Sequence, residues 1–160
     1  PIFIYMPQAV NIYSLVDDVV DFYEGFSTAK KIEIQNQVDA ELFVLVDKHS
    51  MQVVFQNLIS NAIKFSFSSS TVVVSSKAND ASVEISISDS GVGIDAAKLN
   101  TLFDITALYK TSGTQNEQGT GLGLLLCKEF VQKNAGSIHV SSMPKQGTTF
   151  TVTLPKTVVG

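Results

Sequence analysis

The stretch "SVEISISDSGVGI", residues 82–94, decides the fold. Apolar and polar residues alternate from Ser82 to Ser88, as in a half-buried β-strand. The same alternation places the side chain of Asp89 on the buried face, where a carboxylate needs hydrogen-bond donors. Gly91 and Gly93 follow, and glycine permits a positive φ or a close backbone approach. The stretch predicts an inward-pointing acid at a strand end, which either serves a ligand or belongs to an ordinary capped turn.

The segments around this strand predict further strands and helices. Apolar residues recur every three or four positions over 13–29 and 48–65, which predicts two helices. We expect another short helix over about 95–103, and a helix over 122–135 that ends in a left-handed cap at Gly136. Short β-rich runs predict the remaining strands, at 32–38, 42–47, 71–77, 137–142 and 148–155. This order predicts a two-layer α/β sandwich, in which one mixed, mainly antiparallel sheet carries helices on one face.

The composition is that of one soluble globular domain. The 160 residues include 44% hydrophobic and 16% charged ones, enough to form a substantial core. The net charge of −4 and the absence of a basic block argue against nucleic-acid binding. The sequence contains no membrane-spanning run, and because it begins with Pro1 we expect it to be part of a longer polypeptide. The single cysteine, Cys127, lies in an apolar helical run and predicts a buried, inert thiol in a reducing compartment.

A second motif, "FQNLISNAIKFS" at residues 55–66, places polar side chains on one face of a helix. At about 100° per residue, Asn57, Asn61 and Lys64 fall within roughly 60° of one another. An amide oxygen is a suitable ligand for Mg²⁺ and an ammonium group suits phosphate, so this face could serve a magnesium nucleotide. A plain solvated helix face accounts for the same pattern.

A third motif, "QGTGLGL" at residues 118–124, leads three glycines into a helix. Free backbone N–H groups and the positive end of a helix dipole form a good phosphate cradle. The motif is not a P-loop, because no Lys-Ser/Thr pair follows, and no strand precedes it as a Rossmann turn would require. The polar segment at 104–120 is long for a simple connection.

Together these motifs resemble a known family. "NLISNAIKFS", "DSGVGI" and "GTGLGL" are similar to the N, G1 and G2 boxes of the ATP-binding catalytic domain of sensor histidine kinases. That family belongs to the wider group of gyrase, heat-shock chaperone and mismatch-repair ATPases. The similarity covers nearly the whole chain, including "GTTFTVTLP", which resembles the closing strand. It implies a Bergerat-type ATP-binding fold over residues 1–160, a single domain with a flexible ATP lid at 104–120.

The resemblance also implies roles for individual residues. Asp89 would accept a hydrogen bond from the adenine amino group, supported by Thr148 directly or through water, with Phe65 beside the ring. Asn61 would bind Mg²⁺, while Asn57 and Lys64 would lie near the phosphates. The catalytic residues implied are Asn57, Asn61 and Lys64. The cofactor-binding residues implied are Phe65, Asp89, Gly91, Gly93, Gly119, Thr120, Gly121, Leu122, Gly123 and Thr148. Lys110, in the lid, would meet a terminal phosphate. The lid departs from the common pattern, since "FDITALYKTSGTQNEQ" lacks its Pro-Phe pair.

The phosphoacceptor is expected elsewhere. The two histidines, His49 and His139, are predicted to be surface residues, because neither lies in a helix of the phosphoacceptor kind. The resemblance therefore implies transfer of the γ-phosphoryl group of ATP to a histidine on a separate dimerisation domain of the parent protein. A response-regulator receiver domain would act downstream. The domain would be cytoplasmic, in a parent that can be associated with the inner membrane.

Two other functions stay open at this point. One is an ATPase or serine kinase of the same superfamily. Against an ATPase, no glutamate stands at the spacing from Asn61 where those enzymes keep their base, since Gln56 and Asn57 occupy that part of the helix. The other is a degenerate module that only docks a partner.

Overall fold

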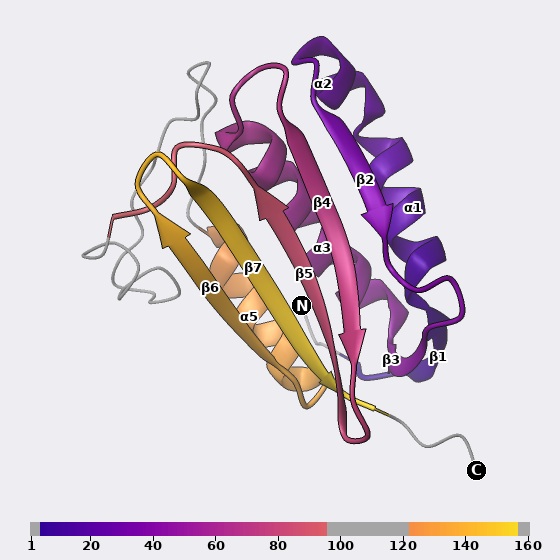
Figure 1. Ribbon diagram of the computed structural model, residues 1–160. Coiled ribbons are helices and arrows are strands. Elements are labelled where there is room, and N and C mark those ends of the chain that lie inside the picture. Colours follow the sequence, from indigo (N-terminus) through magenta and orange to yellow (C-terminus); the bar gives the residue numbers. More distant parts are fainter. Residues whose placement is uncertain (1–3, 96–121, 157–160) are drawn as a thin grey trace.

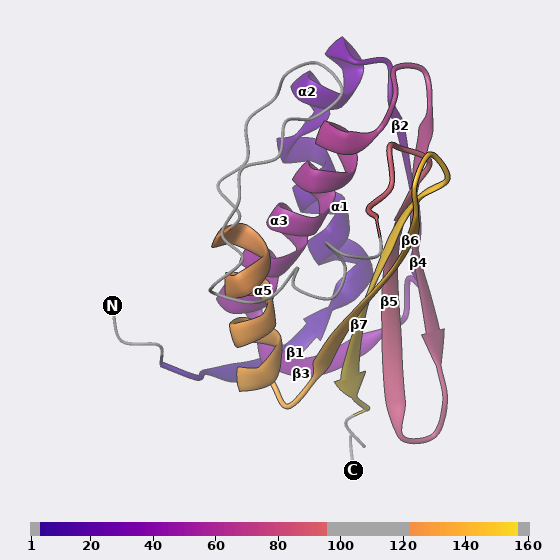
Figure 2. The same cartoon turned by 90° about the vertical axis from the view of Figure 1, so that its left-hand side faces the viewer.

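The computed structural model describes residues 4–95 and 122–156. They form two layers, a five-stranded sheet and a layer of helices on one of its faces (Figures 1 and 2). The strands are β1 (Pro7–Asn11), β2 (Glu33–Gln37), β3 (Phe43–Asp47), β4 (Thr71–Ala78), β5 (Ser82–Asp89), β6 (Ser137–Met143) and β7 (Gly147–Pro155). The helices are α1 (Ile12–Phe22), α2 (Glu24–Ala29), α3 (Lys48–Phe65) and α5 (Leu122–Lys133). The predicted two-layer α/β sandwich is confirmed.

The main sheet has the strand order β2-β4-β5-β7-β6. Only β2 runs parallel to its neighbour, β4, and the other neighbouring strands are antiparallel. The prediction of a mixed, mainly antiparallel sheet is therefore correct. The prediction of one sheet is wrong, because β1 and β3 pair in a separate two-stranded sheet. β1 was not predicted, since "PQAVN" shows little alternation and is held in place by pairing with a strand more than thirty residues away in the sequence.

The helix predicted over 13–29 is in fact two helices. Tyr23, with φ −95° and ψ 7°, ends α1 and caps the start of α2. Two aromatic residues among the apolar ones of the predicted helix, Phe22 and Phe26, are 68% and 67% exposed. Phe22 is the last residue of α1 and Phe26 lies in α2, after the break, whereas Leu15 in the first turn of α1 is buried.

The end of α5 differs from the predicted cap. The residue with a positive φ is Ala135, at 60°, rather than Gly136. Gly136 is needed for another reason, because a Cβ there would lie 2.4 Å from the carbonyl oxygen of Thr153 on β7. Its N–H donates to the Val131 carbonyl at 2.9 Å, so the tight turn lets the chain pass directly from helix to sheet.

Helix α3 is the centre of the helical layer and contacts both α1 and α5. Asp47 caps its N-terminus by accepting a hydrogen bond from the Ser50 N–H at 2.8 Å. Its apolar face is fully buried and includes Met51, Phe55 and Leu58. Because α3 is fixed along its length by this packing, the polar residues on its other face have defined positions relative to the sheet.

The predictions of a buried Cys127 and of two histidines on the surface are confirmed. Cys127 is fully buried, and burial raises the pKa of its thiol to about 12, which makes it inert at neutral pH. His49 and His139 are both exposed. None of the helices in the described ranges is long and apolar enough to cross a membrane.

Candidate functional site

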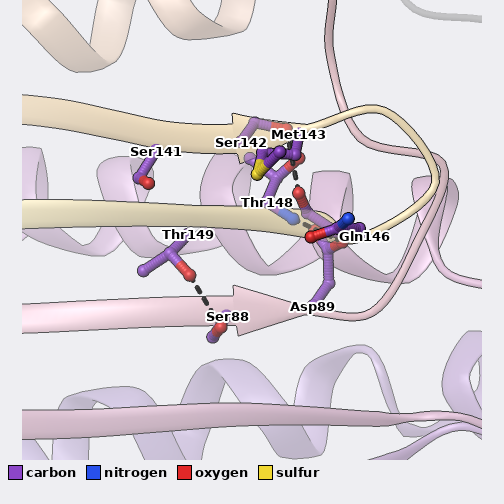
Figure 3. A pocket seen from close by; sticks show the side chains of 9 residues that line it. Ser88, Asp89, Ser141, Ser142, Met143, Gln146, Thr148 and Thr149 are labelled. Atoms are coloured by element: carbon purple, nitrogen blue, oxygen red, sulfur yellow. Dashed lines mark hydrogen bonds between the residues drawn. The ribbon is translucent and has the colours of Figure 1, made fainter.

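A polar row of side chains closes the helix-facing side of the main sheet. Strand register aligns β5, β7 and β6 in successive rows, and the side chains in each row share one face. Two rows are apolar, namely Ile85–Val152–Ile138 and Ile87–Phe150–Val140, and the last row is Asp89–Thr148–Ser142. The core thus ends at this edge of the sheet in one carboxylate and two hydroxyl groups (Figure 3).

Asp89 is held by one of its two carboxylate oxygens. Oδ1 accepts hydrogen bonds from the backbone N–H groups of Gly91 at 2.9 Å and Thr148 at 3.2 Å. Within the described residues, Oδ2 receives no hydrogen bond. Burial raises the pKa of the Asp89 carboxyl above its usual value, and the two N–H donors oppose this effect only in part. The site therefore presents a fixed, partly buried acceptor with one oxygen available to an N–H donor.

The two glycines after Asp89 are required by close contacts with the protein backbone. A Cβ at Gly91 would lie 2.0 Å from the carbonyl oxygen of Phe65, the last residue of α3. Gly93 has a φ of 70°, and a Cβ there would lie 2.0 Å from the carbonyl oxygen of Met143. The turn is also hydrogen-bonded on both sides. The Val92 N–H donates to the Phe65 carbonyl at 3.1 Å, and the Lys145 N–H donates to the Val92 carbonyl at 2.7 Å. The glycines thus lock Asp89 between helix α3 and the β6–β7 hairpin.

The polar face of α3 lies against the start of α5. The side-chain Nδ2 of Asn57 donates to the Val53 carbonyl at 2.9 Å, which fixes the amide orientation. A Cβ at Gly123 would lie 2.6 Å from Asn57 Oδ1, so this glycine lets α5 approach α3 closely. The Asn61 amide makes no hydrogen bond with the described part of the chain, and the ammonium of Lys64 lies 4.8 Å from the centre of the Phe65 ring. This face is not a plain solvated surface.

Lys30 supports the end of α3 and was missed by sequence analysis. It is only 5% exposed, and its Nζ donates to the carbonyl oxygens of Ile63 at 3.0 Å and Lys64 at 2.8 Å. A cation at a helix C-terminus satisfies carbonyl groups that have no partner within the helix. Because these contacts join residues 33 and 34 positions apart, no local pattern indicates them.

A shallow hollow of about 180 Å³ lies at the same end of the sheet (Figure 3). Its lining residues are Ser88, Asp89, Ser141, Ser142, Met143, Gln146, Gly147, Thr148 and Thr149. Ser88, Ser141 and Thr149 alternate with core-facing residues, so the hollow opens on the sheet face that the helices leave uncovered. It is smaller than a typical ligand pocket, and it also borders the polar row, because Asp89, Ser142 and Thr148 are among its lining residues.

The structure brings together most of the predicted site residues that it describes. Asp89 accepts hydrogen bonds from Gly91 and Thr148, and the glycine turn after Asp89 is hydrogen-bonded to Phe65. Gly123 lies close to Asn57. Leu122 is the first residue of α5. The other predicted positions lie outside the described residues, namely the short helix at 95–103 except for Asp95, the lid at 104–120 with Lys110, and Gly119, Thr120 and Gly121. Ser142, at the end of the polar row, was not predicted, although it continues the inward alternation of Ile138 and Val140.

The comparison with known families agrees with this geometry. The family model HATPase_c, described as "Histidine kinase-, DNA gyrase B-, and HSP90-like ATPase", matches residues 46–158. The chain belongs to the HATPase_c family. The match begins in β3 and includes both Asp89 and Thr148, so the polar row lies within the part of the chain that defines the family.

Individual relatives of this HATPase_c domain include a sensor histidine kinase and a sensor protein. It is 35% identical over 150 residues to the sensor histidine kinase WalK of Bacillus subtilis. This match covers 92% of this chain and 24% of WalK. It is 30% identical over 159 residues to the sensor protein EvgS of Escherichia coli O157:H7, covering 96% of this chain and 13% of EvgS. The chain thus spans less than a quarter of the length of these relatives. The catalytic domain of histidine kinase ThkA has the same fold, with a TM-score of 0.82, 23% identity, and coverage of 96% of this chain and 99% of that domain.

Proposed function

We propose that this domain binds ATP with Mg²⁺ and donates the γ-phosphoryl group to a histidine on a separate dimerisation domain of a parent sensor kinase. The observation that carries the proposal is the geometry of Asp89. One oxygen is fixed by two backbone N–H groups, and the other is available to a ligand. The family to which the chain belongs is described as one of ATPases. An exocyclic amino group such as that of adenine is a suitable N–H donor for this oxygen.

We propose that the other site residues contact ATP in order, from the adenine base to the phosphates. Thr148 lies beside Asp89 in the polar row and supports the adenine contact. Phe65 is proposed to lie next to the adenine ring. Lys64 and Asn57 are on the face of α3 that leads from Phe65 towards the start of α5. We propose that the first N–H groups of α5 receive the phosphates, and that Gly119, Thr120, Gly121, Leu122 and Gly123 also take part in binding them. Phosphoryl transfer depends mainly on such positioning and on charge neutralisation.

The residues present suit a magnesium ion bound together with a nucleotide. Mg²⁺ prefers oxygen ligands and keeps several waters and phosphate oxygens, so it needs few ligands from the protein. The amide of Asn61 makes no hydrogen bond within the described residues. We propose its Oδ1 as the ligand that the protein provides to Mg²⁺. The described residues include no group of three or more His, Cys, Asp or Glu that could hold a metal without a nucleotide. When bound, Mg²⁺ would neutralise charge on the phosphates.

Both histidines of the chain are poorly placed to accept a phosphoryl group from this site. His49 is in the first turn of α3, whereas Asn61 is twelve residues later, a separation of roughly 18 Å along a helix. His139 alternates with Ile138 and Val140 and so lies on the uncovered face of the sheet, opposite Asp89. These positions support an acceptor on another domain, and we propose that a response-regulator receiver domain acts downstream of it. They also support a parent protein longer than this chain.

The test combines the domain with radiolabelled ATP, Mg²⁺ and a separately supplied dimerisation domain of a sensor kinase. We expect acid-labile, base-stable phosphate on that second protein, and we expect the label to be lost with Asn61→Ala. Release of inorganic phosphate without transfer would indicate an ATPase, and acid-stable phosphate would indicate a serine kinase. ATP binding with no turnover under any of these conditions would contradict the kinase proposal and favour a docking module.

A further inference from the structure

Ser142 occupies the end of the polar row and is bonded in three directions. Its Oγ lies 2.8 Å from Thr148 Oγ1, 2.9 Å from the carbonyl oxygen of Gly147, and 2.8 Å from the backbone nitrogen of Ile94. One serine hydroxyl thus connects the turn after Asp89, the β6–β7 hairpin and the side chain of Thr148.

Counting protons fixes the direction of these hydrogen bonds. A serine hydroxyl has one proton and two acceptor lone pairs. The backbone N–H of Ile94 can only donate and the carbonyl of Gly147 can only accept, so Ser142 gives its single proton to Gly147. The bond to Thr148 can then form in one way only, with the Thr148 hydroxyl as donor and Ser142 as acceptor. Thr148 therefore keeps only acceptor lone pairs for any other partner.

We infer that Ser142 is a positioning residue that sets purine specificity by holding the Thr148 proton away from the site. This inference rests on the proposed function, because it assumes that the base lies against Asp89. Asp89 and Thr148 are direct cross-strand partners on the same face of the sheet. With the Thr148 proton used by Ser142, both side chains present acceptors to the base. They therefore match the amino group at position 6 of adenine, which carries two N–H donors.

The same arrangement disfavours a purine that has a carbonyl oxygen at position 6. In inosine triphosphate that oxygen would face the carboxylate of Asp89 and the lone pairs of Thr148, with no donor from either. Removing the Ser142 hydroxyl frees the Thr148 proton to turn towards the base. Thr148 could then donate to the 6-oxo group, and the site would distinguish the two nucleotides less well.

The test measures Kd for ATP and for inosine triphosphate with the 160-residue chain, by titration calorimetry. The quantity of interest is the ratio of the two Kd values. We expect Ser142→Ala to lower the preference for ATP roughly three- to tenfold, the range of one hydrogen bond. A merely structural loss would weaken both nucleotides alike and leave the ratio unchanged. Ser142→Thr, which keeps the hydroxyl, should retain the wild-type ratio.

Two further variants isolate the path through Thr148. Ser141→Ala is the matched control, because it makes the same change one residue away on the exposed face of β6 and should leave the ratio unchanged. In a Thr148→Val background, Ser142→Ala should no longer change the ratio, since there is no proton left to release. An unchanged ratio in Ser142→Ala, or an equal change in the Thr148→Val background, would overturn the inference. If the wild-type chain binds neither nucleotide, the proposed function itself fails and this inference with it.

A direct measurement covers the case in which Ser142→Ala does not fold. In the NMR spectrum of the wild-type chain, the Thr148 hydroxyl proton should exchange slowly and show a nuclear Overhauser effect to the β-protons of Ser142. A Ser142 hydroxyl proton directed at Thr148 Oγ1 would instead overturn the inference.

Discussion

Replacing Asp89 with asparagine should separate ATP binding from stability. Asparagine keeps the size of the side chain and one carbonyl oxygen. The two N–H donors from Gly91 and Thr148 require an acceptor, so that oxygen should occupy the Oδ1 position. The new amide Nδ2 then takes the place of Oδ2 and presents donors to the adenine amino group, which is itself a donor.

The expected loss of affinity follows from this exchange. A hydrogen bond to a charged acceptor contributes about 1.5–3 kcal/mol, and leaving a buried donor unpaired costs about 1–3 kcal/mol more. Taken together, a loss of about 3–5 kcal/mol corresponds to at least a hundredfold increase in Kd for ATP. Titration calorimetry of wild type and Asp89→Asn measures it. Asp80→Asn is the control, since it removes the same charge from an exposed position at the other end of the β4–β5 hairpin.

Stability should change in the opposite direction. Burial raises the pKa of Asp89 in the folded chain above its ordinary value of 3.8, so folding favours the neutral form. The stability that Asp89 contributes is present below the pKa of its carboxyl in the unfolded chain. It is lost as pH rises through the pKa of that carboxyl in the folded chain. Asp89→Asn is neutral throughout, and its free energy of unfolding at pH 7 should equal or exceed that of wild type in urea titrations. A clear fall in stability, or unchanged ATP affinity, would refute the assignment of Asp89 as a binding rather than a structural residue.

Three further perturbations test the surroundings of this carboxylate. Asn61→Ala should leave metal-free ATP binding unchanged but remove its enhancement by Mg²⁺, measured by calorimetry with Mg²⁺ and with EDTA; a retained enhancement would argue against Asn61 as the ligand. Gly91→Ala places a Cβ 2.0 Å from the Phe65 carbonyl oxygen and should cost about 2–4 kcal/mol of unfolding free energy, whereas a neutral effect would show that the turn can move freely. Lys30→Met removes the hydrogen bonds to the Ile63 and Lys64 carbonyls and should cost about 2–3 kcal/mol, while exposed Lys31→Met costs little; equal effects would contradict the capping role.

Local patterns were sufficient to predict the elements that bury one clear face. The alternation in β5 placed Asp89 on the inner side of the sheet, and the helical period over 48–65 matches α3 residue for residue. The surface histidines and the buried Cys127 follow from the same kind of reasoning. In each case the signal lies within one helix or strand, so no information from the rest of the fold was needed.

Features that depend on distant partners were not predictable in this way. The strands at 33–37 and 43–47 are close in the sequence but belong to different sheets, because each pairs with a partner elsewhere in the chain. The alternation along β6 places Ser142 on the inner face, but the partners of Ser142 and of Lys30 are the glycine turn and the end of α3, which only tertiary packing brings to them. Gly136 was correctly marked as special, but for conformation rather than for its contact with Thr153.

Adenine recognition by Asp89 is tested most directly by a crystal structure of this chain with a non-hydrolysable ATP analogue and Mg²⁺. We predict the adenine amino group at about 2.7–3.2 Å from Asp89 Oδ2, on the helix-facing side of the sheet, with the metal on Asn61 Oδ1. A nucleobase bound elsewhere, or a site left empty at saturating analogue, would contradict the assignment.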